Sequence, residues 1–468
     1  SHVLDALTKL EIVEIVLTKG EDDPQVIFES INSTGLELSN ADLIRNYLLM
    51  NADDQEKLYE NYWLYIEKRL RNKMDYSNLD AFFMQYIVYK TSKPVNSRQL
   101  YNSFVKLFKD SGYSQENILK ELRYYAEIFG AFVYGSDRYS DRINKLLYRL
   151  RVLNQTTCYP FLLHVFDDYH QGVITEETVE KILQFILAYL LRRMVCGVPS
   201  NTLRGLFTYL YNRIFKVASN KQKYYETLNK FLFTVSSKDV IPSAAEFERA
   251  LQKANIYGNN ALCRFLLLDI ENGDGKEILQ AENLTIEHIM PQTLSADWSH
   301  IRPEEHEEYL HTLGNLSVTG YNSELSNKSF AEKRDIIREN SKAVILNSDV
   351  LDKESWNVAD IQARAKRLAG IVLARYKIER ILDDSIEFEY IETLTLDNYD
   401  EVTGKKLVSF ELFGETYRQN KYALMLLDVI KLLDKKSPGK LQTLAEESVR
   451  HLLMKKPELL RCSQESKQ

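Results

Sequence analysis

Residues 284–292 read LTIEHIMPQ, and residues 313–320 read LGNLSVTG. The first run is typical of a short apolar strand that ends at His288, directly after an acidic residue. The second run predicts another strand, bounded by two glycines. A helix is predicted over residues 323–340. The order over residues 256–380 is therefore strand, long loop, strand and helix.

The rest of the chain is poor in residues that break helices. It holds 17 Gly and 9 Pro in 468 residues, about half the usual share of each. Apolar residues recur at spacings of three and four over residues 54–255, for example in KILQFILAYL at 181–190, which predicts an α-helical bundle. A composition that is 44% hydrophobic and 11% aromatic excludes a disordered chain.

Two shorter segments flank these regions. Residues 1–53 contain a helix that starts at Ser39, where Asp42 is placed to complete a capping box. Residues 385–468 predict a small α+β domain, because hydrophobic and acidic residues alternate with period two from Ile386 and an apolar helical pattern follows.

Cysteine spacing and hydropathy indicate the cellular compartment in which we expect the protein. The four cysteines are scattered and form no CxxC pair, which argues against a disulfide framework and a cysteine zinc site. Apolar stretches fall short of the roughly 18 residues that a spanning helix needs. We therefore expect a cytoplasmic protein that has no membrane partner.

Four of the eight histidines lie within 24 residues: His288, His300, His306 and His311. Their spacing does not place two rings on one helical face, so zinc is disfavoured. His300 and His306 lie among glutamates, which predicts solvent-facing residues. His288 differs because it ends an apolar strand.

The motifs around His288 occur in a definite order. They are Glu-His-Ile-x-Pro-Gln from Glu287, Leu-Gly-Asn-Leu around Asn315, Tyr-Asn at Asn322 and Asn-Lys-x-Phe-x-x-Lys ending at Lys333. This set resembles the HNH nucleases, whose fold is two strands and a helix around one divalent cation. The resemblance implies a mainly α protein with an embedded ββα-metal nuclease domain at 256–380.

These residue types suit the hydrolysis of a phosphodiester bond. Imidazole titrates near neutral pH, so His288 is the expected general base, and the resemblance makes Asn315 the residue that holds it in position. Glu287 and Asn322 would hold Mg²⁺ or Mn²⁺, which prefer oxygen ligands, although many HNH sites carry Asp where Glu287 stands. Lys328 and Lys333 would bind flanking phosphates. The alternative is that His288 and the asparagines only satisfy turns, and His311 is left between loop packing and phosphate contact.

The N-terminal segment carries a second resemblance. The runs VIFESINSTG at 26–35 and LSNADLIRN at 38–46 are similar to a block of the ParB-like domain of GmrSD-type restriction endonucleases. The Asp-Gly-Gln-Gln-Arg block that serves nucleotide hydrolysis in that family is absent, so we expect residues 1–53 to be a remnant and any NTP to act through a missing N-terminal part. Asn32, Ser33, Thr34 and Gly35 either offer backbone NH groups to a phosphate or form a turn with Gly35 at positive φ.

Charge is unevenly distributed. The total is −7, which alone disfavours nucleic acid, but residues 181–230 hold nine basic residues against one acid, with tyrosines interleaved. Arg192, Arg193 and Arg204 are the candidate DNA contacts in this stretch. The alternative is a solvated basic face with the tyrosines in the core and an arginine that offsets a helix C-terminus.

Together these observations predict a cytoplasmic, metal-dependent HNH endonuclease that acts on double-stranded DNA. The resemblance to GmrSD-type enzymes alone implies the type IV restriction kind, with cleavage of modified DNA in defence against foreign DNA. The alternatives are a nucleotide-regulated DNA-binding protein with an inactive HNH remnant and an RNA-cleaving HNH toxin. Assembly into a homo-oligomer is left open. The expected domains are 1–53, 54–255, 256–380 and 385–468.

Overall fold

The computed structural model describes residues 38–50, 52–71, 77–215, 218–235, 239–273, 284–320, 325–388, 407–413 and 415–440. The chain divides into two compact units, residues 1–389 and 390–468, so the expected boundaries after residues 53 and 255 fall inside the first unit. The predicted mainly α class is confirmed. None of the described helices is both long enough and apolar enough to cross a membrane.

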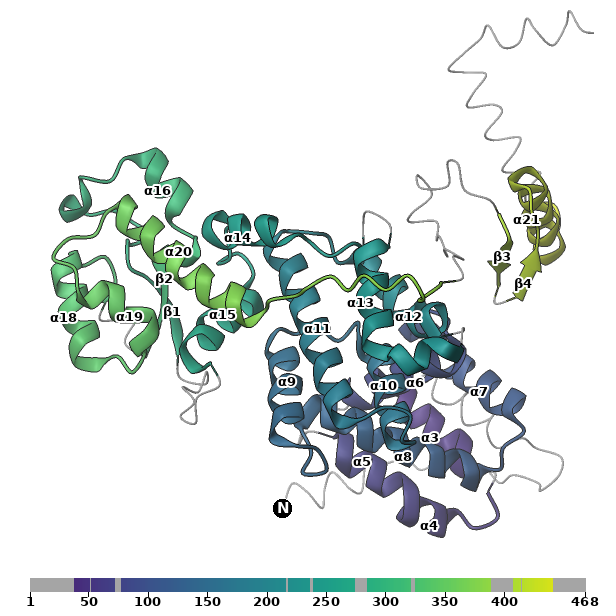
Figure 1. Cartoon of the computed structure of the whole chain (residues 1–468). Helices are drawn as coiled ribbons and strands as arrows, with labels where there is room; N and C mark the ends of the chain where they lie inside the picture. The colour runs from purple at the N-terminus through teal and green to yellow at the C-terminus, as the bar shows by residue number, and fades with distance from the viewer. Residues whose placement is uncertain are drawn as a thin grey trace, which may run out of the picture. The chain divides into compact units, whose positions relative to one another are not determined.

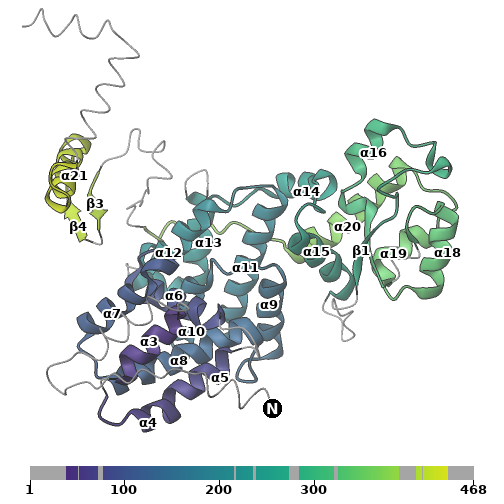
Figure 2. The same ribbon diagram turned by 180° about the vertical axis from the view of Figure 1, so that it is seen from behind.

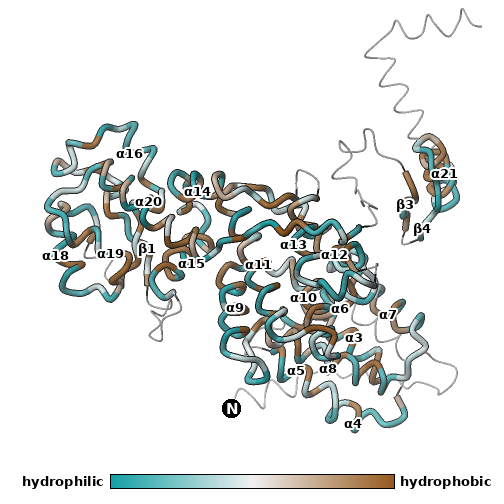
Figure 3. The backbone as a smooth tube through the Cα atoms, in the orientation of Figure 1, coloured by the Kyte–Doolittle hydropathy of each residue, from teal (hydrophilic) through white to brown (hydrophobic). Residues whose placement is uncertain are grey.

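Helix follows helix through most of the first unit (Figure 1). Hydrophobic and hydrophilic residues alternate along these helices (Figure 3), as expected for helices that bury one face. Both views show α9 and α11 side by side (Figure 2). The elements of this part are α3 (Asn40–Met50), α4 (Gln55–Leu58), a π-helical turn (Tyr59–Trp63), α5 (Leu64–Leu70), α6 (Ser77–Thr91), α7 (Leu100–Ser111), α8 (Gln115–Tyr134), α9 (Asp141–Val152), α10 (Tyr159–His170), α11 (Glu176–Val195), α12 (Asn201–Phe215), α13 (Tyr224–Thr234), α14 (Ala244–Lys253) and α15 (Asn260–Asn272).

Side-chain caps define where many of these helices begin. Ser114, Ser140 and Thr175 each accept a hydrogen bond from the backbone NH three residues later. The start predicted at Ser39 is confirmed, because its Oγ accepts from the NH of Asp42 at 3.1 Å. Helix α3 then buries Ala41, Ile44 and Leu48 in the common core.

A pair of antiparallel strands interrupts the helices. Strand β1 (Thr285–His288) pairs with β2 (Leu316–Thr319), so that His288 lies opposite Leu316. Figure 1 shows helices gathered around this pair. They are α16 (Pro303–Tyr309), α18 (Phe330–Asn340), α19 (Val344–Leu351) and α20 (Val358–Arg375).

This part has an apolar cluster of its own. Trp298 and Trp356 are buried there, and the Phe330 ring stacks on Trp356 with centroids 5.5 Å apart. Helix α18 begins later than predicted because the Ser329 side chain caps it, with Glu332 completing a capping box.

The C-terminal unit contains a hairpin and a helix among its described residues. Strand β3 (Ser409–Leu412) pairs antiparallel with β4 (Glu415–Arg418), and α21 (Tyr422–Lys436) follows.

The strand predicted from Ile386 is wrong over the described residues 386–388. The carbonyl oxygens of Ile386 and Glu387 accept hydrogen bonds from the side chains of Lys230 and Asn220. Period-two alternation here reflects packing of an extended segment against helices, with Phe388 edge-on to Phe231 at 5.3 Å.

Gly314 allows α20 to approach the turn before β2. A Cβ at Gly314 would clash with the backbone oxygen of Ile361 and lie 3.0 Å from the Cβ of Ala365.

We expect Gly314→Ala to destabilise the protein by about 1–3 kcal/mol, because a rigid backbone atom must shift, as measured by urea unfolding. Gly370→Ala is the matched control: Gly370 lies in α20 with open space around it, so the change should stabilise by about 0.5–1 kcal/mol. Equal effects at both positions would contradict this interpretation.

Candidate functional site

Strand β1 delivers two ionisable side chains into the interior. Glu287 and His288 are its last residues, and each is only 4% exposed. The backbone NH of Ile289 still donates to the carbonyl of Asn315 at 2.9 Å, so the chain stays tied to the β2 side directly after His288. Both side chains therefore have fixed positions.

Both ring nitrogens of His288 have partners. The Gln292 amide nitrogen lies 3.2 Å from Nδ1 of His288, and Nδ1 of His311 lies 3.1 Å from its Nε2. Burial lowers the pKa of His288 to about 3, and the neighbouring His311, Lys333 and His306 act in the same direction. The imidazole is thus neutral at physiological pH, as a general base must be before it accepts a proton.

Asn315 holds the loop that follows His288. Its Oδ1 accepts from the NH of Met290 at 2.7 Å, and its Nδ2 donates to the carbonyl oxygens of Met290 and Leu310 at 2.9 Å each. The side chain is fully buried. Asn315 thus lies where the sequence expects a positioning residue, with contacts to the backbone two residues beyond His288.

Glu287 forms a buried ion pair. Its Oε1 lies 2.6 Å from Nζ of Lys333, which also donates to the carbonyl of His288 at 2.8 Å. Burial raises the pKa of Glu287 and lowers that of Lys333, while the charge of each partner opposes these shifts. The pair ties α18 to the end of β1.

This pairing bears on two predicted roles. Lys333 is 1% exposed, so it does not reach a flanking phosphate, and that prediction is corrected. The Glu287 carboxylate already faces a cation, so it does not fit a metal ligand in this conformation. Among the described residues, His, Cys, Asp and Glu form no group of three that could hold a metal ion.

The other residues near the site that were predicted to contact phosphate, Lys328 and His311, are more exposed than Lys333. Lys328 is exposed, and its Nζ lies 4.0 Å from Glu332. His311 is half-buried against the Tyr257 ring. His300 is exposed as expected, whereas His306 is half-buried with Nε2 2.9 Å from the carbonyl oxygen of Pro291. Asn322 lies outside the described residues, as do Asn32, Ser33, Thr34 and Gly35.

The basic stretch is largely used within the protein. Arg192 and Arg193 are 3% and 1% exposed and donate to the carbonyl oxygens of Pro242 and Pro199. Arg204 donates to the carbonyl of Val95. The prediction that Arg192 and Arg193 contact DNA is corrected, because both are buried and backbone carbonyl groups take up their donors. Arg204 is exposed, and its contact with DNA stays a prediction.

Lysines of the same stretch form ion pairs or hydrogen bonds. Lys181 pairs with Glu177, Lys221 with Asp168, and Lys223 with Asp383. These lysines of the basic stretch are therefore paired with acidic residues of the same protein.

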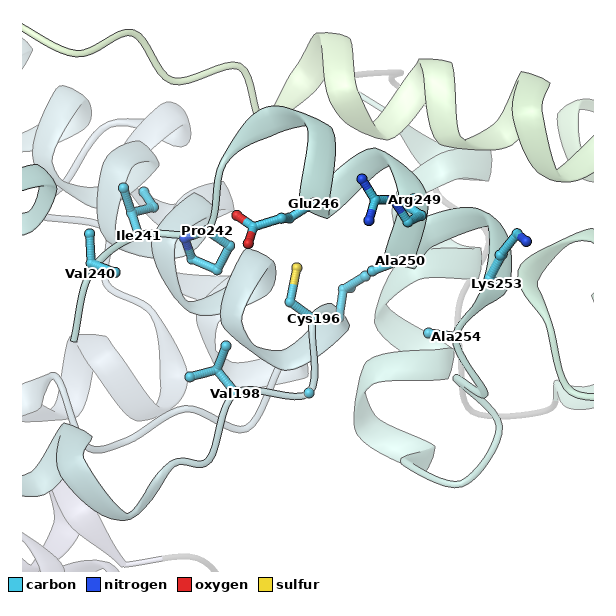
Figure 4. Close-up of a pocket in the computed structure, with 12 residues that line it drawn as sticks. Cys196, Val198, Val240, Ile241, Pro242, Glu246, Arg249, Ala250, Lys253 and Ala254 are labelled. Atoms are coloured by element: carbon cyan, nitrogen blue, oxygen red, sulfur yellow. The ribbon is translucent and has the colours of Figure 1, made fainter. Parts of the chain in front are cut away.

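A pocket of about 610 Å³ lies between the end of α11 and α14 (Figure 4). Cys196, Glu246, Arg249 and Lys253 contribute polar side chains to its lining, and no residue predicted for the site lines it.

Sequence reasoning missed two neighbours of His288. Gln292 belongs to the quoted motif but received no role. Tyr257 lies in the loop between α14 and α15, and its ring is edge-on to His288 with centroids 4.6 Å apart. Nothing in the local pattern around Tyr257 signals this contact.

Comparison with known proteins finds one family. Residues 241–371 match the family model of the C-terminal domain of GmrSD restriction endonucleases. No curated protein matches the chain. The matched range contains His288, His311, Asn315 and Lys333, and the predicted resemblance to GmrSD-type restriction endonucleases is confirmed within it. The finer assignment to the HNH kind stays a prediction. The resemblance of residues 1–53 to the ParB-like block stays a prediction.

The ion pair between Glu287 and Lys333 should dominate local stability. We expect Lys333→Met or Glu287→Gln to destabilise by about 3–5 kcal/mol, because each leaves a buried group without its partner. The double variant Glu287→Met with Lys333→Met should recover most of this loss in urea unfolding. Lys328→Met is the control from the same helix region and should change stability by less than about 0.5 kcal/mol. Additive losses in the double variant would contradict a coupled pair.

Acid should unfold the protein partly through His288. Its folded pKa of about 3 lies below the unfolded value near 6.5, so the unfolded state binds the extra proton and stability falls as pH drops below about 6.5. Urea unfolding at pH 7 and pH 5 should show wild type losing roughly 2 kcal/mol more than His288→Gln. Identical pH slopes would show that the ring is protonated normally in the folded protein.

Proposed function

We propose that this chain is a divalent-cation-dependent DNA endonuclease of the HNH kind, which hydrolyses phosphodiester bonds in modified foreign DNA. The observation that carries the proposal is the arrangement of His288 at the end of β1, with Asn315 holding the loop beyond it, inside the range that matches a restriction endonuclease domain. The strand pair β1–β2 followed by helix α18 supports the proposal, because the HNH resemblance expects two strands and a helix in this order.

His288 is proposed as the general base that takes a proton from the attacking water. Its Nδ1 faces the amide of Gln292, an exposed side chain. Displacement of that amide frees a lone pair toward solvent. An anionic phosphodiester bound nearby stabilises the imidazolium and raises the pKa of His288 toward the range in which a base is effective.

The proposed cation is Mg²⁺ or Mn²⁺, which would neutralise charge on the scissile phosphate and leaving oxygen. Asn322 remains the oxygen donor suggested by the motif. Glu287 is not included, because its carboxylate is paired with Lys333. Lys328 is the exposed cation of the motif that remains available for a flanking phosphate.

That same ion pair favours the alternative of an inactive HNH remnant in a DNA-binding regulator. A carboxylate that is paired with a buried lysine is not free to bind a cation, as an active metal site would require. An RNA-cleaving toxin shares the chemistry and differs only in substrate. A cleavage assay separates the three.

The assay follows nicking of supercoiled plasmid with Mg²⁺, Mn²⁺ or EDTA, on unmodified and base-modified DNA, beside RNA of the same sequence. We expect cation-dependent cleavage of modified DNA and a loss of about 100- to 10,000-fold in His288→Ala, the range that a general base contributes.

His300→Gln is the matched control. His300 is exposed, and its Nε2 forms a hydrogen bond with the carbonyl oxygen of Trp356. It should cleave as wild type does. DNA binding without cleavage would favour the regulator, and cleavage confined to RNA would favour the toxin. Equal nicking by His288→Ala would overturn the assignment of the base.

A further inference from the structure

We propose that His311, held by Tyr257, is a positioning residue that fixes the tautomer and orientation of His288. The role rests on the proposed function, in which His288 is the base. It differs from both readings of His311 that the sequence left open, loop packing and phosphate contact.

The hydrogen bonds of His288 and His311 determine which ring donates and which accepts. The atom of the Gln292 amide that faces Nδ1 of His288 is the nitrogen, which can only donate, so this orientation of the amide requires Nδ1 to be unprotonated. The proton of the neutral ring then lies on Nε2, 3.1 Å from Nδ1 of His311, which accepts it. The chain of donors therefore runs from Gln292 through His288 to His311.

Two anchors keep His311 in place to accept this proton. Its ring stacks on Tyr257, with centroids 5.0 Å apart and planes 7° from parallel. Its carbonyl oxygen accepts from the NH of Ile256 at 3.1 Å. On the other side, Asn315 donates to the carbonyl of Leu310. The acceptor atom is thus held by the α14–α15 loop and by the same asparagine that holds the loop after His288.

The orientation has a chemical consequence. With Nε2 committed to His311, the lone pair of His288 is presented at Nδ1, beside the exposed Gln292 side chain where water can enter. A ring free to flip or to change tautomer would present an N–H there for part of the time. A group that fixes a catalytic imidazole in this way acts as the third member of a nucleophile–base–orienter set does.

Selective ¹³C,¹⁵N-histidine NMR on the full chain tests the proposal without any cleavage. The His288 signal, assigned with His288→Gln, should show the Nε2–H tautomer in wild type. His311→Ala should give mixed tautomers, because without an acceptor at Nε2 the exposed Gln292 amide can turn its oxygen toward Nδ1 and accept a hydrogen bond there. His311→Asn, whose Oδ1 can take the place of Nδ1, should restore the wild-type signal. Tyr257→Phe should match wild type, because only the ring is used, and Tyr257→Ala should resemble His311→Ala.

Kinetics then separates positioning from the other roles. We expect His311→Ala to lower kcat about 10- to 100-fold, as loss of an outer orienting partner does, with KM unchanged and partial recovery in His311→Asn. A raised KM with an intact tautomer would show phosphate contact, and a lowered Tm with an intact tautomer would show loop packing. Either outcome overturns the proposal.

Failure of this inference and failure of the proposed function give different results. A wild type that cleaves nothing but shows the Nε2–H tautomer only while His311 is present refutes the nuclease and keeps the pairing. A wild type that cleaves and keeps its tautomer in His311→Ala refutes the pairing alone.

Discussion

The candidate site depends on one buried amide. The Asn315 side chain forms two hydrogen bonds with the backbone of Met290, just after β1, and donates a third to the carbonyl of Leu310, at the end of α16. Three backbone groups outside the strands are thus paired with one side chain. Unpaired buried backbone groups are costly, and this side chain lets the chain turn away from β1 without that cost. The position of His288 follows, because it directly precedes the held loop.

Local patterns predicted much of this region, and long-range pairing explains what they missed. Short runs of neighbouring residues were enough to predict three features. They are the strand that ends at His288, the strand after Gly314 and the capped start of α3. The Glu287–Lys333 pair joins residues 46 positions apart, and Tyr257 reaches the site from a separate loop. A lysine on a polar helix is exposed by default, so Lys333 was predicted to bind a flanking phosphate.

Charge counted along the chain proved a poor guide to surface charge. Arg192 and Arg193 belong to a stretch with a large positive excess, yet both lie inside, where carbonyl oxygens at loops and helix ends take up their hydrogens. Arginine suits this task because its planar guanidinium offers several donors in fixed directions. The basic excess helps to join helices to loops.

Helix α20 completes the site from the far end of the region. It packs on the turn at Gly314, and Lys333 and Asn315 must both be in place before Glu287 and His288 are fixed. During synthesis, a ribosome-bound chain that ends before residue 375 can form the preceding helices but lacks part of this support. If the chain cuts DNA, the site is complete only once the residues of α20, up to Arg375, have been synthesised.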